Sequence, residues 1–130
     1  MSSVAEVRQI FDTYLDSNWD TTIKDWPNMS NVVPQKASWI KADLIIAHSF
    51  NTTIGTRRTR HSGDYIIRLY TPLNIGVGPG FLLASQLLAL LENKRLNDDI
   101  LTYAGSVRNI GDAGYGSYQF NILIPFTAES

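Results

Sequence analysis

The fold is decided by a glycine-rich turn and the apolar stretch after it, which together read GVGPGFLLASQLLALL at residues 76–91. Between positions 81 and 91 only one serine and one glutamine are polar. Pro79 suits the first turn of a helix, where its missing N–H is not needed. A helix without a polar face cannot lie in water on a small lone domain. We therefore expect a helix up to about Asn93 that its own sheet, another helix or a neighbouring subunit covers on most sides.

An amphipathic helix is predicted near the N-terminus, over residues 3–17. Ser3 and Glu6 are spaced as a capping box, in which each side chain satisfies the other's backbone donor. Apolar residues then recur at helical spacing, with polar residues on the opposite face. This helix therefore has one face to pack against a sheet.

Alternating apolar and polar residues predict long strands on both sides of the apolar helix. Two of them, 38–50 and 63–71, are expected to pair as an antiparallel hairpin. In the first, the even-numbered residues from Ile40 to Phe50, His48 among them, are expected to share one face. After the helix, 100–110 is a weaker strand candidate, 111–114 reads as a turn, and 115–126 alternates cleanly. A short strand is also expected near 22–26.

These elements give the order α-(β)-β-β-α-β-β, which indicates an α+β fold. We expect one mostly antiparallel mixed sheet with two helices packed on one face. At 130 residues the chain is expected to form a single domain, 1–130. The longest apolar run is too short to span a membrane, and no secretory signal is visible.

No motif for catalysis or cofactor binding is recognised in the sequence. The chain has no cysteine, and its two histidines lack metal-ligand spacing. The glycines at 76, 78 and 80 fit neither the dinucleotide pattern nor the P-loop. We therefore expect no enzyme activity, no metal and no cofactor, and interpret the glycines as a strand-to-helix turn.

A long basic loop is predicted at 51–62, with nothing acidic inside it. Its candidate contact residues are Ile54, Arg57, Arg58, Arg60 and His61. They could form a solvated loop tip, contact another protein subunit through bidentate arginine pairs, or contact nucleic-acid phosphate.

Two tryptophans, Trp26 and Trp39, are candidate interface aromatics. For Trp26, as for Trp19, the alternative is that the side chain closes one end of the core.

The ordered motifs of this chain resemble the tail terminator proteins of long-tailed bacteriophages, also called tail completion or minor tail proteins. The carrying features are Val4-x-x-Val7-x-x-Ile10-Phe11, Trp26-Pro27-Asn28, a proline before Trp39-Ile40, the segment 63–72, Gly76-x-Gly78 with its apolar helix, and the segment 118–126. Their order and spacing, over nearly the whole chain, support the resemblance.

The resemblance implies a structural virion protein, assembled in the host cytoplasm, at the head-proximal end of the tail. Family members form a hexameric ring that caps the tail tube, stops its polymerisation and offers a docking surface to the head. The implied partners are other copies of the chain, the tail tube protein and the head-completion or connector protein. Nucleic acid is expected only by passage of the genome through the ring. In such rings the long loop between the central strands is mobile in the free subunit and becomes ordered in the assembly. Residues 51–62 match the position of that loop. A head-completion or neck adaptor protein, or a nucleic-acid-binding module, is the alternative.

Overall fold

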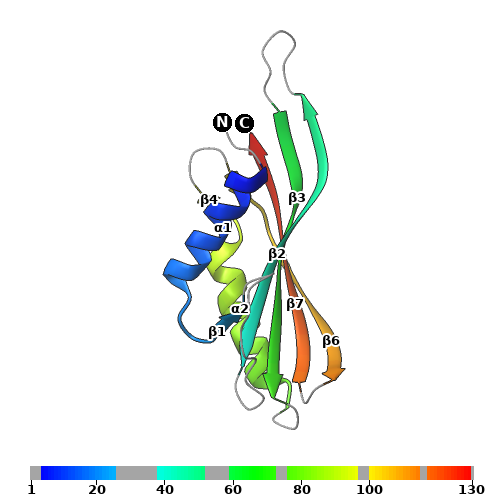
Figure 1. Cartoon of the computed structure of the whole chain (residues 1–130). Coiled ribbons are helices and arrows are strands. Elements are labelled where there is room, and N and C mark those ends of the chain that lie inside the picture. The colour runs from blue at the N-terminus through cyan, green and yellow to red at the C-terminus, as the bar shows by residue number, and fades with distance from the viewer. Residues whose placement is uncertain are drawn as a thin grey trace.

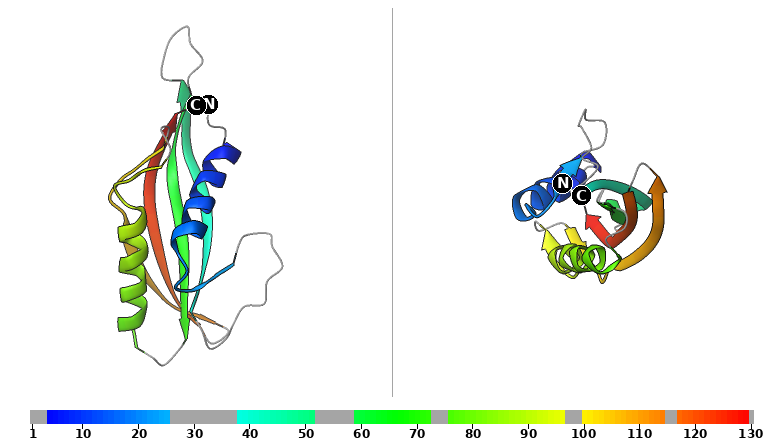
Figure 2. Two further views of the ribbon diagram at one scale, coloured as in Figure 1. Left: turned by 90° about the vertical axis from the view of Figure 1, so that its left-hand side faces the viewer. Right: turned by 90° about the horizontal axis from the view of Figure 1, so that it is seen from below.

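The computed structural model describes residues 4–25, 38–51, 59–72, 76–96, 100–114 and 117–129. One curved sheet forms the first layer, and two helices on one of its faces form the second (Figures 1 and 2). The elements in chain order are α1 (Val4–Asn18), β1 (Ile23–Asp25), β2 (Trp39–Asn51), β3 (Thr59–Pro72), α2 (Gly78–Leu91), β4 (Arg95–Leu96), β5 (Ile100–Thr102), β6 (Ser106–Gly114) and β7 (Ser117–Glu129). The α+β prediction is confirmed.

The sheet has seven strands in the order β1-β2-β3-β7-β5-β4, and β6 also pairs with β7. The β1–β2 pair is parallel and the others are antiparallel. The short strand β5 pairs with the C-terminal end of β7, and β6 pairs with its N-terminal half, so both lie along the same edge of β7. The long strands β2, β3 and β7 give the molecule its elongated shape (Figure 1).

Several predicted boundaries differ from the structure. The strand predicted at 100–110 is divided between β5 and β6, and the residues predicted as a turn, 111–114, continue β6. The glycines in that segment fall where the ladder shifts register, and Gly111 has a φ of 109°. Register shifts of this kind accommodate extra residues within a strand. The glycines here therefore allow bulges within β6 and do not reverse the chain direction.

The core lies between the helices and the inner face of the sheet. Phe11 of α1 stacks on Tyr65 of β3 at a centroid distance of 4.5 Å and meets the edge of Phe126 of β7 at 5.1 Å. The predicted alternation holds for the centres of the strands, whose fully buried side chains are Ile40 and Ala42 of β2, Tyr65, Ile67 and Leu69 of β3, and Phe120, Ile122, Ile124 and Phe126 of β7.

The alternation predicted for β2 is interrupted near its end. Ile46 is paired with Gly63, but the next paired residue is His48, opposite Ser62. One residue is therefore inserted, and two-residue periodicity does not carry from Ile46 to Phe50. The face predicted for the side chains of His48 and Phe50 lies outside the described part and stays a prediction.

The apolar helix α2 is covered on one side only. Its buried residues are Gly80, Ala84, Leu87 and Leu91, while Leu82 is 61% exposed. Gly80 permits the close approach, because a Cβ there would come within 2.2 Å of the Phe120 ring. The helix ends at Leu91, two residues earlier than predicted, and Asn93 adopts a positive φ of 53° that is typical of a residue after a helix. The chain itself leaves part of this apolar helix in solvent.

Candidate interaction surface

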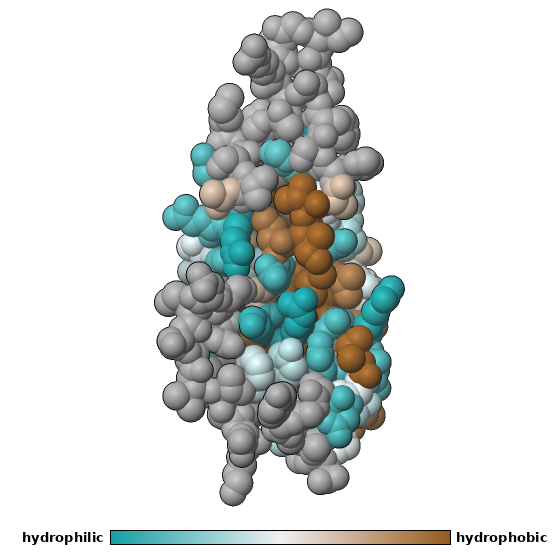
Figure 3. Space-filling model, turned by 45° about the vertical axis from the view of Figure 1, so that its right-hand side comes forward, coloured by the Kyte–Doolittle hydropathy of each residue, from teal (hydrophilic) through white to brown (hydrophobic). Residues whose placement is uncertain are grey.

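The sheet face turned away from the helices, called here the outer sheet face, is free within the described residues. Figure 3 shows a band of hydrophobic side chains along it, with hydrophilic side chains beside and below. Ile45 is 46% exposed, and Ile66 and Leu123 are half-buried. Ile66 is directly opposite Leu123, and Ile45 lies diagonally from Ile66 across the β2–β3 pair. These three residues form one apolar patch across three strands.

Three cations lie in one cross-strand row next to this patch. Lys41 of β2 is opposite Arg68 of β3, Arg68 is opposite Asn121 of β7, and Asn121 is opposite Arg108 of β6. Neighbouring strands are about 4.8 Å apart, so this basic row is roughly 14 Å wide. Like charges directly opposite each other destabilise a sheet. Lys41 and Arg68 are such a pair, whereas Asn121 separates Arg68 from Arg108.

An aromatic pair lies in the next row. Trp39 stacks on Tyr70 with ring centroids 4.0 Å apart and an interplanar angle of 12°. The Trp39 indole N–H is buried and has no hydrogen-bond partner among the described residues. The register of β2 and β3 places Trp39, a predicted interface aromatic, beside the basic row on the outer sheet face.

The free edge of β2 carries a charged side chain. Beyond Lys41 the described strands leave β2 without a neighbour on that side. The Asp43 carboxylate accepts the backbone N–H of Leu44 at 2.9 Å and lies 3.7 Å from the Arg8 guanidinium of α1. Charged groups placed along an edge discourage the addition of another strand. Asp43 thus disfavours strand addition at this part of the edge.

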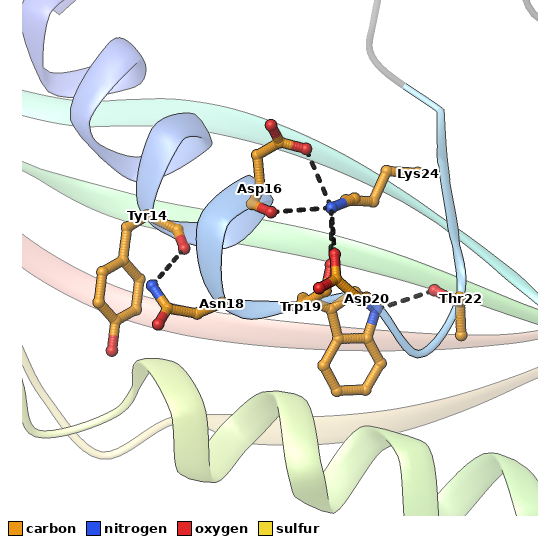
Figure 4. Close-up of polar contacts among 7 residues, drawn as sticks. All are labelled: Tyr14, Asp16, Asn18, Trp19, Asp20, Thr22 and Lys24. Carbon is orange, nitrogen blue, oxygen red and sulfur yellow. Dashed lines mark hydrogen bonds and ion pairs between the residues drawn. The ribbon is translucent and has the colours of Figure 1, made fainter.

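On the helix side, two acids surround one lysine at the end of α1 (Figure 4). The Lys24 ammonium donates to the backbone carbonyls of Asp16 at 3.0 Å and Trp19 at 2.6 Å. Its ion-pair distances are 2.9 Å to the Asp16 carboxylate and 3.7 Å to that of Asp20. Lys24 thereby satisfies carbonyls at the helix end. The Asp20 side chain remains 92% exposed, so this acidic corner presents negative charge to solvent.

The described part of the chain contains few of the predicted contact residues. Arg60 and His61 lie in β3 and are half-buried, so the predicted loop is shorter at this end. Each of them already interacts with another group. Ile54, Arg57, Arg58 and Trp26 lie outside the described residues. The basic row was missed by sequence reasoning, because four strands in register bring its members together.

Other kinds of site find no support in the described ranges. They contain no group of three or more potential metal ligands. Neither of the two described helices is long and apolar enough to cross a membrane.

Comparison with known proteins identifies the family. Eleven chains of solved structures are similar to this one. One of them has a TM-score of 0.72 at 14% sequence identity, covering 98% of this chain and 96% of the other, which supports the fold alone. A comparison with curated proteins found no match. The sequence profile of the phage tail terminator proteins matches residues 6–122. Because this match includes most of the chain, the protein belongs to the phage tail terminator family.

Proposed function

We propose that this protein forms a hexameric ring that caps the tail tube at its head-proximal end, stops tube polymerisation and provides the docking surface for the head. Membership of the tail terminator family, by a match over residues 6–122, is the observation that supports this most directly. It makes the protein a structural component of a phage tail. The further partners are the tail tube protein and the head-completion protein.

The exposed apolar surface of the subunit supports assembly into a ring. The outer sheet face carries the patch of Ile45, Ile66 and Leu123, and α2 exposes Phe81 and Leu82. These two surfaces belong to different layers of the molecule. A ring of identical subunits needs two different complementary surfaces on each copy, because its contacts run head to tail. A subunit with exposed apolar groups on both layers meets this requirement.

The test is native mass spectrometry of the purified protein, combined with electron microscopy of purified tail tubes incubated with it. We expect rings of six copies, and tubes that carry a ring at one end and stop growing. A protein that stays monomeric and leaves tube growth unchanged would refute the proposal. Locating the protein in intact particles separates the tail terminator from a head-completion or neck adaptor protein.

The predicted basic loop supplies a second, more specific test. Replacing Arg57, Arg58 and Arg60 by alanine should weaken ring or tube contacts, because guanidinium groups form bidentate pairs at protein interfaces. The double variant Arg57→Ala, Arg58→Ala should change thermal unfolding little, whereas Arg60 lies in β3. If the triple variant still forms rings and caps tubes like the wild type, the loop has no part in either contact.

A further inference from the structure

We propose that neighbouring copies meet by the outer sheet face of one copy against the helix layer of the next, with the basic row facing the acidic corner. The basic row is Lys41, Arg68 and Arg108, and the acidic corner is Asp16 and Asp20. This inference depends on the homo-oligomeric part of the proposed function and names the two surfaces that join.

The two charged groups lie at the same level along the strands. In the parallel β1–β2 pair, Lys24 is opposite Ile40, one residue from Lys41 in the basic row. The side chain of Ile40 is buried in the core, so Lys24 points to the helix side as well, where it contacts Asp16. The basic row and the acidic corner are thus on opposite faces of the subunit at matching height. A rotation about an axis parallel to the strands can therefore bring one against the other in the next copy.

Neither group is neutralised by the described part of its own subunit. The structure shows no ion pair for Lys41, Arg68 or Arg108 with another described residue. At the acidic corner one lysine serves two carboxylates, and that lysine also donates to two backbone carbonyls. The row therefore has an excess of positive charge and the corner an excess of negative charge. Complementary charge of this kind fixes partner and register at interfaces.

The surroundings of the basic row favour a protein partner over nucleic acid. The adjacent row contains Asp43, Ile66 and Leu123, and the row on its other side contains the Trp39–Tyr70 stack. The helix layer offers exposed apolar side chains too, on α2. Apolar and aromatic residues around a charged centre are typical of protein interfaces, whereas contact with a phosphate backbone uses a continuous basic surface.

Charge reversal with rescue tests this arrangement. We expect Arg68→Glu and Asp20→Lys each to raise the protein concentration needed for half-assembly at least about tenfold, since like charges facing each other at an interface are strongly unfavourable. A mixture of the two variants, and a chain with both changes, should assemble again. Lys94→Glu is the matched control, because it makes the same charge reversal at an exposed residue outside the basic row and the acidic corner, and should have a much smaller effect than Arg68→Glu. Native mass spectrometry measures assembly, and circular dichroism melting checks that each variant is folded.

The outcomes separate this inference from the proposed function. Wild-type rings that Arg68→Glu leaves intact would overturn the inference alone, and so would a double variant that assembles no better than the single ones. A wild type that stays monomeric in solution and on tube ends would overturn both proposals. If Arg68→Glu abolished DNA binding in a mobility-shift assay while rings persisted, the row would belong to a nucleic-acid contact and the inference would be wrong.

Discussion

The hydrogen bond between Tyr65 and Asp12 joins α1 to the centre of the sheet, and its removal is a quantitative test of the structure. The Tyr65 hydroxyl donates to the Asp12 carboxylate at 2.6 Å. Tyr65→Phe removes this bond and keeps the ring that stacks on Phe11. A hydrogen bond to a charged group contributes about 1.5–3 kcal/mol to stability. The Asp12 side chain is 26% exposed and keeps Arg8 at 3.4 Å, so water can solvate the released oxygen. We therefore expect a loss of about 2 kcal/mol, near the middle of that range.

A matched control is available on the same helix. Tyr14 donates to the backbone carbonyl of Leu90 at 3.0 Å, which is a neutral acceptor. Tyr14→Phe makes the same chemical change and should cost about 1 kcal/mol. Urea denaturation followed by circular dichroism measures both losses, and an unchanged m-value shows that the compared states are the same. If Tyr65→Phe costs no more than Tyr14→Phe, the charged acceptor contributes nothing extra and the reasoning is refuted.

The same bond predicts a dependence on alkaline pH. Burial, and then the hydrogen bond to Asp12, raise the pKa of the Tyr65 hydroxyl well above its ordinary range. The folded state thus favours the protonated phenol, and this contribution is complete below about pH 10, the pKa of an unfolded tyrosine. Above that pH it is lost at up to about 1.4 kcal/mol per pH unit. Stability measured from pH 9 to pH 11 should fall more steeply for the wild type than for Tyr65→Phe, and parallel curves would contradict the assignment.

Three further substitutions test the packing, each by its effect on the free energy of unfolding in urea. Gly63→Ala should cost roughly 1–3 kcal/mol, because the new Cβ would lie 1.9 Å from the Ile45 carbonyl oxygen and must displace backbone. Gly80→Ala should cost less than Gly63→Ala, because its Cβ clashes with the side-chain ring of Phe120 and not with backbone. Alanine also favours the helix over glycine by about 0.5–1 kcal/mol. A loss equal to or larger than that of Gly63→Ala would contradict this. Thr102→Val should cost about 2 kcal/mol, because the buried hydroxyl donates to the Leu91 carbonyl at 2.6 Å and accepts the Lys94 N–H at 2.7 Å. A neutral effect would show that water takes over both hydrogen bonds.

The sequence predicted those parts of the fold in which periodicity and burial agree. The inner-face residues of β3 and β7 follow strict alternation, as in Tyr65, Ile67 and Leu69, and each is buried. Prediction failed where a glycine could belong either to a turn or to a bulge within a strand. The glycines between 111 and 114 resemble a turn in the sequence, yet the segment continues β6 through two register shifts. A local pattern does not distinguish a bulge from a reversal, because both need the same backbone freedom.

The candidate surface was predicted only in part, for a related reason. Trp39 was predicted as an interface aromatic from its own chemistry, and the structure places it on this face, while its role in an interface stays a prediction. The basic row could not be recognised in this way, because Lys41, Arg68 and Arg108 are far apart in the sequence and separated by apolar residues. Only the register of β2, β3, β7 and β6 places them side by side. Surfaces that depend on strand register are therefore less predictable than those formed by one segment.

The apolar helix α2 is buried on one side and leaves two large apolar side chains exposed. Its composition indicated cover on most sides, and the chain supplies that cover on the side of Gly80, Ala84, Leu87 and Leu91. Leu82 is left 61% exposed and Phe81 41% exposed. A buried leucine or phenylalanine stabilises by about 1.5–3 kcal/mol relative to an exposed one. Covering these two residues with the next copy would therefore favour assembly. The opposite charges of the basic row and the acidic corner would determine which surface of that copy binds.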